Sequence, residues 1–174
     1  MSADQVDALV IFGATGDLAK LETFPALVGL VERGVLNVPV LGVAKSGWGL
    51  PQFRDYAAAA LKLNNMDPAA PAAVKLLDLL RYVDGDLGDH ATYEAMATAL
   101  GPDAKRMLYY LEVPPFLFGR IAEGISGVGL AAQSHVMVEK PFGNDLASAQ
   151  ALNSTIHQYF PRGVGLPGRP LAGA

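Results

Sequence analysis

The chain has 174 residues, the length of about one domain, and 51% of it is hydrophobic, which is enough for a packed core. A net charge of −4 argues against the basic patch that nucleic-acid and membrane-surface proteins need, so neither partner is expected. The absence of cysteine excludes disulfides, thiolate metal sites and thiol catalysis. The N-terminus is polar and no apolar run reaches the ~18 residues of a membrane span, so we expect a cytoplasmic protein.

Apolar runs and helical periodicities alternate along the chain. The first run, residues 8–12, ends at a glycine and predicts a strand buried on both faces. A helix is predicted over 17–33, where Pro25 should kink or weaken it and Gly34 should stop it. The further predicted elements are strands over 38–43, 81–83, 106–113 and 134–138, and helices over 50–63, 70–80, 89–100, 115–125 and 145–160. This alternation predicts an α/β fold: a single domain with a Rossmann-like, doubly wound parallel sheet and helices on both faces.

The composition changes after Phe160. Residues 161–174 have no hydrophobic period and are dominated by glycine and proline. We therefore expect a domain over 1–160 and a disordered tail over 161–174.

The strongest local motif is Gly13-Ala14-Thr15-Gly16-Asp17-Leu18-Ala19, between the first strand and the first helix. Small residues let the backbone turn tightly and approach a pyrophosphate, while the helix N-terminus offers N–H groups and the positive end of its dipole. The motif is a G-x-x-G-x-x-A variant of the dinucleotide-binding turn, and its position favours that function. The alternative is a glycine turn of the kind that any α/β domain contains.

The second predicted strand is followed by Lys45 and Ser46. An NAD-preferring site usually places an acidic residue near here, to accept hydrogen bonds from the ribose hydroxyls. A cation favours a 2′-phosphate instead, so the predicted cofactor is NADP, and Lys20 could add positive charge. The alternative is that Lys45 is an ordinary solvated loop lysine.

Four segments, taken together and in this order, resemble the glucose-6-phosphate dehydrogenase family. They are Gly13-Ala14-Thr15-Gly16-Asp17-Leu18-Ala19-Lys20, Gly42-Val43-Ala44-Lys45-Ser46, Tyr110-Leu111-Glu112-Val113-Pro114-Pro115 and Val138-Glu139-Lys140-Pro141-Phe142-Gly143-Asn144-Asp145-Leu146. Lys45 stands where the family usually has arginine. The resemblance covers roughly residues 7–160.

The resemblance implies an enzyme of the pentose phosphate pathway that oxidises glucose 6-phosphate at C1 to 6-phosphoglucono-lactone and passes a hydride to NADP. It implies that the backbone of 13–20 holds the coenzyme phosphates, that Lys45 pairs with the 2′-phosphate, and that two prolines border the nicotinamide. The expected coenzyme-binding residues are Gly13, Ala14, Thr15, Gly16, Asp17, Leu18, Ala19, Lys20, Lys45, Ser46, Pro114, Pro115 and Lys140.

Lys140 is also expected to contact the sugar phosphate substrate, and its bond to Pro141 is a candidate for cis/trans switching. The alternative is a surface lysine before a turn proline. Full-length family members form homo-oligomers, while the oligomeric state of this chain stays open.

The resemblance ends at Pro161. The family continues with an arginine-isoleucine-aspartate-histidine-tyrosine-leucine-glycine-lysine segment, whose histidine removes the C1 hydroxyl proton. None of His90, His135 and His157 matches that position, and no metal-ligand spacing is present. We therefore expect no catalytic residue in this chain, weak or no binding of glucose 6-phosphate, and little turnover. A shifted reading frame at this junction is a hypothesis.

The main hypothesis is a glucose-6-phosphate dehydrogenase or a fragment of that enzyme, and three alternatives to it remain. The chain could bind NADP without reacting it, it could belong to another sugar oxidoreductase, or it could be a non-functional product with exposed apolar surface. Lys20 and the pair Phe24-Pro25 favour the glucose-6-phosphate family over other oxidoreductases.

Overall fold

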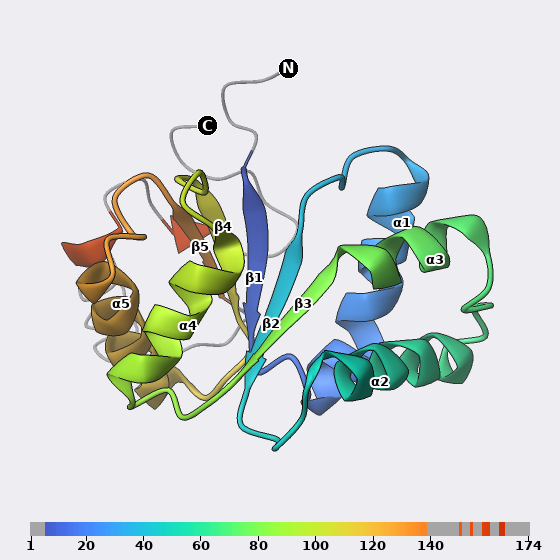
Figure 1. Ribbon diagram of the computed structural model, residues 1–174, viewed down its shortest axis with the longest axis horizontal. Helices are drawn as coiled ribbons and strands as arrows, with labels where there is room; N and C mark the ends of the chain where they lie inside the picture. Colours follow the sequence, from blue (N-terminus) through green and yellow to red (C-terminus); the bar gives the residue numbers. More distant parts are fainter. Residues whose placement is uncertain (1–5, 139–149, 151–153, 155–157, 161–163, 166–174) are drawn as a thin grey trace.

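A computed structural model of the protein describes residues 6–138, 150, 154, 158–160 and 164–165. Its centre is a parallel sheet with the strand order β3-β2-β1-β4-β5-β6 (Figure 1). The strands are β1 (Ala8–Phe12), β2 (Val40–Ala44), β3 (Leu80–Asp84), β4 (Met107–Leu111), β5 (His135–Val138) and β6 (Val164–Gly165). The order reverses direction between β1 and β4, and sheets of this kind bind ligands beyond the carboxyl ends of the strands at such a point.

Helices cover both faces of the sheet (Figure 1). On one face lie α1 (Phe24–Glu32), α2 (Leu50–Leu63) and α3 (Pro71–Leu79), and on the other lie α4 (His90–Leu100) and α5 (Phe118–Gly127). The expected doubly wound α/β fold is therefore confirmed. In the described part of the chain, no helix combines the length and the apolar character that crossing a membrane requires.

Two apolar clusters hold the helices on the sheet, one on each face. All residues of β1 and β2 are buried, as the continuous apolar run of the first strand predicted. Phe12 packs on Tyr109 in one cluster, with ring centroids 6.1 Å apart, and Phe24 packs on Phe53 in the other at 5.8 Å. Because each fully buried large apolar side chain contributes roughly 1.5–3 kcal/mol, these clusters fix the strand ends that form the site.

The first helix is continuous from Asp17 but has two parts. A π-helical turn, η1 (Ala19–Thr23), precedes α1, and Pro25 lies in the first turn of α1. A proline has no N–H to donate to the preceding turn, so the wider turn stands directly before it. The predicted stop is confirmed, since Gly34 has a φ of +73° and its N–H donates to the Val31 carbonyl at 3.0 Å.

The C-terminal residues differ in part from the prediction. Val164–Gly165 forms β6 beside β5, so the expectation of a tail without regular structure over 161–174 is wrong at these two residues. The edge of a sheet presents unpaired N–H and C=O groups, and a short extended segment can pair with them through its backbone alone. Such a segment can therefore form a strand without a periodic pattern of hydrophobic residues. The helix predicted over 145–160 lies mostly outside the described residues. Phe160 is buried, with its ring centroid 5.8 Å from that of Tyr109.

Candidate functional site

A glycine turn follows β1, at the reversal point of the sheet. Gly13 has a φ of +81°, and its N–H donates to the Val43 carbonyl at 2.9 Å. A Cβ built on Gly13 would lie 2.3 Å from the carbonyl oxygen of Glu112. Only glycine fits here, because both the backbone conformation and the space between the ends of β2 and β4 exclude a side chain.

The turn leads directly into the helix that begins at Asp17. The Gly16 N–H donates to the Gly13 carbonyl at 3.1 Å, and the Lys20 N–H donates to the Gly16 carbonyl at 3.2 Å. Ala14 and Ala19 are fully buried beneath the turn, where larger side chains would push the helix off the sheet. The first N–H groups of a helix have no acceptor inside that helix, so this end suits an anion.

A cavity of about 360 Å³ opens beside the turn, at the carboxyl ends of four strands. Such a volume is typical of a small-molecule site. Its lining comprises Gly13, Thr15, Gly16, Val43, Ala44, Lys45, Gly85, Asp86, Leu87, Glu112, Val113, Pro114 and Leu117. The structure thus brings five of the predicted site residues to one cavity.

A second cavity, of about 220 Å³, adjoins the first. Leu18, Pro115 and Phe118 line it, and Glu112, Val113 and Pro114 line both cavities. The two prolines expected at the nicotinamide therefore lie between or beside the cavities. They precede α5, and Pro115 begins a single 3₁₀ turn, η2 (Pro115–Leu117).

The other predicted coenzyme-binding residues that the structure describes line neither cavity. Ala14 and Ala19 support the turn from below, whereas Asp17, Lys20 and Ser46 line neither cavity. Lys140, the residue expected to bind both coenzyme and substrate, lies outside the described residues.

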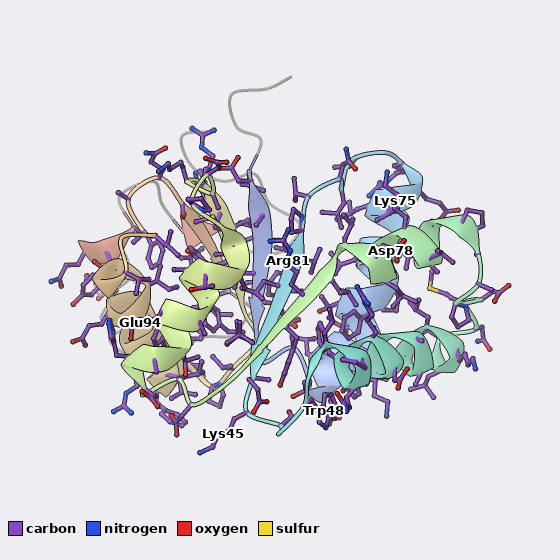
Figure 2. All side chains as sticks on the ribbon, viewed as in Figure 1. Lys45, Trp48, Lys75, Asp78, Arg81 and Glu94 are labelled. Carbon is purple, nitrogen blue, oxygen red and sulfur yellow. The ribbon has the colours of Figure 1, made fainter. Side chains whose placement is uncertain are left out.

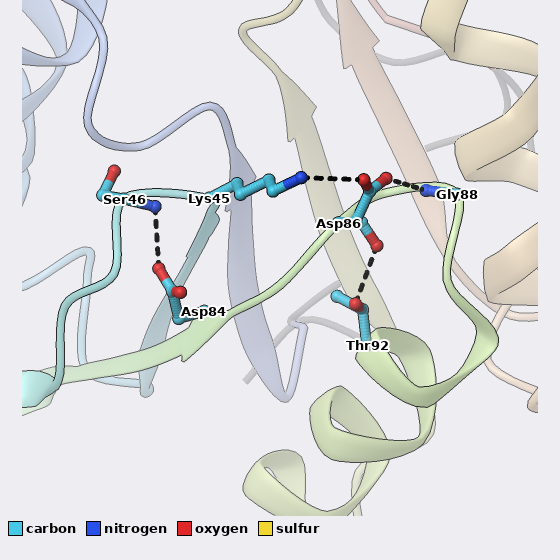
Figure 3. A network of polar contacts seen from close by, with 6 residues as sticks. All are labelled: Lys45, Ser46, Asp84, Asp86, Gly88 and Thr92. Carbon is cyan, nitrogen blue, oxygen red and sulfur yellow. Dashed lines mark hydrogen bonds and ion pairs between the residues drawn. The ribbon is translucent and has the colours of Figure 1, made fainter.

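Lys45 makes an ion pair across the mouth of the first cavity. Its Nζ lies 3.1 Å from Oδ2 of Asp86, and the two side chains are 73% and 55% exposed (Figure 3). Asp86 Oδ1 accepts the Gly88 N–H at 2.8 Å. That backbone hydrogen bond, followed by Lys45, holds the pKa of Asp86 below its ordinary value. Lys45 is thus neither an unpaired cation nor a lysine in contact with solvent alone.

Asp84, at the end of β3, organises the loop that follows β2. Its Oδ1 accepts the N–H groups of Ser46 at 2.8 Å, Gly47 at 3.0 Å and Trp48 at 3.4 Å. Oδ1 also accepts the Tyr82 hydroxyl at 2.6 Å, and this bond is the largest cause that lowers the pKa of Asp84. Asp84 and Asp86 were not among the predicted site residues. Their signal was the pair of carboxylates flanking Gly85 directly after the third strand.

Two further hydrogen bonds join the glycine turn to its surroundings. The side-chain oxygens of Thr15 and Ser46 lie 2.8 Å apart, and the Tyr56 hydroxyl donates to the Gly16 carbonyl at 3.0 Å. The Tyr56 ring packs against Trp48, with ring centroids 5.3 Å apart. Burial raises the pKa of Tyr56, with a smaller contribution from Asp17, so the phenol remains a donor at neutral pH.

Glu112 directly follows β4 beside the glycine turn, and its N–H donates to the Phe12 carbonyl at 2.9 Å. Thr23 donates a hydrogen bond from its hydroxyl to Glu112 Oε2, which ties the first helix to the end of β4. Glu112 and Asp86 line the first cavity with Lys45, so its described lining is not simply cationic.

Neither described histidine lines these two cavities. His135 is buried in β5, and His90 begins α4, where its Nε2 lies 3.8 Å from Glu94. Within the described ranges no group of acidic residues and histidines is arranged to hold a metal ion.

Known proteins resemble this chain over most of its length. The family model described as Glucose-6-phosphate dehydrogenase, NAD binding domain, matches residues 10–163. Glucose-6-phosphate 1-dehydrogenase 1 of Mycobacterium tuberculosis is 42% identical over 151 residues, which are 86% of this chain and 32% of that protein. The Dictyostelium discoideum glucose-6-phosphate 1-dehydrogenase is 34% identical over 164 residues, covering 87% of this chain and 32% of that protein.

Solved structures agree with these relatives. The glucose-6-phosphate 1-dehydrogenase of Mycobacterium avium superposes with a TM-score of 0.83 at 40% identity, over 90% of this chain and 34% of that one. A solved glucose-6-phosphate dehydrogenase in complex with its substrate glucose-6-phosphate superposes with a TM-score of 0.81 at 28% identity. The match covers 95% of this chain and 37% of that one. The chain spans about a third of the length of the curated relatives it matches. It belongs to the family of glucose-6-phosphate dehydrogenase NAD-binding domains.

Proposed function

We propose that the chain binds NADP at the carboxyl edge of its sheet, as the coenzyme-binding part of an enzyme that oxidises glucose 6-phosphate. One observation carries the proposal: the Gly13 turn and the start of the first helix open on a cavity of about 360 Å³ at the reversal point of the strand order.

The residues present fit a dinucleotide. The glycine turn lets phosphate approach the backbone, and the helix start offers N–H groups to its oxygens. Val43, Leu87 and Val113 supply apolar walls for flat rings. Lys45 is the basic side chain of the described lining, so the role we assign to it is binding the 2′-phosphate. The bound coenzyme supplies the hydride acceptor.

Titration of NADPH and NADH fluorescence tests the binding. We expect Lys45→Met to weaken NADPH binding by about 2- to 5-fold, the range for an exposed charge pair, and to leave NADH unchanged. Lys75→Met is the matched control, because Lys75 is an exposed lysine on α3, away from the site (Figure 2). An unchanged NADPH affinity in the Lys45→Met chain, or an equal loss of NADPH and NADH affinity, would remove the role of Lys45. Failure to bind either coenzyme would refute the proposed function.

The substrate, glucose 6-phosphate, rests on the family and on the solved relative described with that sugar phosphate. A second candidate function is coenzyme binding without turnover, which the histidine-free described lining of both cavities favours. Absorbance of NADPH formed from NADP and glucose 6-phosphate separates the two. We expect no turnover by the 174-residue chain, and steady NADPH formation would overturn that expectation.

A further inference from the structure

The ion pair between Lys45 and Asp86 has a consequence for coenzyme choice. We infer that Asp86 is a specificity-determining residue, which holds the Lys45 ammonium so that a 2′-phosphate has to compete with its carboxylate. The inference rests on the proposed function, because it concerns the same site. It assigns to Asp86 an effect opposite to that of Lys45.

Asp86 is the fixed member of the pair (Figure 3). Its Oδ1 accepts the Gly88 N–H at 2.8 Å, and its main-chain carbonyl accepts the Thr92 hydroxyl at 2.7 Å. Lys45 reaches it with a long, flexible side chain that is 73% exposed. A 2′-phosphate therefore meets a lysine already directed at a carboxylate, and it must draw the ammonium away or share it beside a like charge.

The loop backbone offers no ready substitute for Lys45. The N–H groups of residues 46–48 would otherwise form an anion-binding concavity after β2. Instead, all three donate to Oδ1 of Asp84. Within the described lining of the cavity, recognition of a 2′-phosphate depends on Lys45, and Asp86 controls how available Lys45 is.

A coenzyme without the 2′-phosphate escapes this competition. NADH carries a neutral 2′-hydroxyl, which can donate a hydrogen bond to a carboxylate. Asp86 lines the same cavity and stays ionised at neutral pH. The pair thus narrows the difference in affinity between the two coenzymes, so that the preference for NADPH is smaller than Lys45 alone would give.

The substitution Asp86→Asn tests this inference. Asparagine keeps the Oδ1 acceptor for Gly88 and removes only the charge that holds Lys45. We expect the ratio of NADPH to NADH affinity to rise by about 2- to 5-fold, as measured by fluorescence titration at low salt. Adenosine 2′,5′-bisphosphate and AMP, which differ only in the 2′-phosphate, should show the same change when they displace NADPH. Asp78→Asn removes an equal charge from α3, away from the site, and should leave the ratio unchanged (Figure 2).

The same Asp86→Asn substitution made in the Lys45→Met chain shows whether Asp86 acts through Lys45. In the Lys45→Met chain, Asp86→Asn should raise the ratio less than in the unmodified chain, because no ammonium remains to be released. An equal rise in both chains would mean that Asp86 acts on the coenzyme directly and not through Lys45, and it would overturn the inference. An unchanged ratio in the Asp86→Asn chain, with both coenzymes still bound, would also overturn it while sparing the proposed function. Loss of binding of both coenzymes by the unmodified chain would refute the proposed function itself.

Discussion

The side-chain oxygens of Thr15 and Ser46 lie 2.8 Å apart, although 31 positions separate them in the chain. This hydrogen bond joins the turn after β1 to the loop after β2, the two segments expected to hold the coenzyme phosphates. The two strands place their ends side by side, since Phe12 pairs with Val43. The glycine turn after β1 is thus held partly by a side chain of the neighbouring loop.

We expect Thr15→Val to weaken this connection without changing the shape of the side chain. The lost hydrogen bond should cost about 0.5–1.5 kcal/mol in the free energy of unfolding, measured by urea denaturation. NADPH should bind more weakly, because the turn is less fixed. Ser46→Ala should have a similar effect, and the double variant should lose less than the sum of the two. Strictly additive losses would show that the two hydroxyl groups do not act together.

Gly13→Ala should damage the site more than any other small change in the turn. A Cβ would lie 2.3 Å from the Glu112 carbonyl, and the φ of +81° already disfavours alanine. Gly34→Ala is the matched control, because Gly34 has a φ of +73° but nothing within 4 Å of an added Cβ. We expect about 1–2 kcal/mol for Gly34→Ala from backbone strain alone.

The clash at Gly13 should add about 1–3 kcal/mol to that cost and abolish measurable NADPH binding. Urea denaturation and coenzyme titration of both variants measure the difference. If the two alanine variants were equally stable, the close approach of the turn to Glu112 would not constrain the site.

Residues close together in the sequence made the fold and the turn predictable. The buried run of β1, the glycine turn and the helix after it are contiguous, so their pattern is visible in one stretch. The roles of Asp84 and Asp86 depend instead on contacts 38 and 41 residues away. The two carboxylates that flank Gly85 form a local pattern, but that pattern does not show which partners they contact. It therefore could not predict that Asp84 accepts the loop amides or that Asp86 pairs with Lys45.

Gly124→Ala tests the packing of α5 against α4. An added Cβ would lie 2.4 Å from the ring of Tyr93, which is buried and donates from its hydroxyl to the Leu87 carbonyl. We expect a loss of about 1–3 kcal/mol in the free energy of unfolding. Gly29→Ala in α1 is the control, because an added Cβ there meets nothing within 4 Å. That variant should be more stable by about 0.5–1 kcal/mol, as a glycine in an unobstructed helix interior is destabilising. Thermal unfolding of both variants measures the contrast.

The Asp84 carboxylate makes the loop after β2 sensitive to acid. Hydrogen bonds from Tyr82, and then from the amides of the loop, lower its pKa in the folded protein, while in the unfolded chain the carboxyl has its ordinary value. The stabilisation is therefore complete above that ordinary value and is lost as the pH falls through the folded pKa. Because Asp84 is exposed, we expect it to be worth about 1 kcal/mol or less at neutral pH.

Asp84→Asn should remove this pH dependence while keeping an oxygen that accepts hydrogen bonds. The stability difference between the unmodified chain and the variant should be largest near pH 7, and it should shrink as the pH falls below the ordinary pKa of 3.8 and through the lower pKa of the folded protein. Urea denaturation at a series of pH values measures it, and hydrogen exchange at the amides of 46–48 should be faster in the variant at pH 7. Asp103→Asn, an exposed change in the loop before β4, controls for the loss of one charge. A difference that grew on acidification would show that the carboxylate does not stabilise the loop in its ionised form.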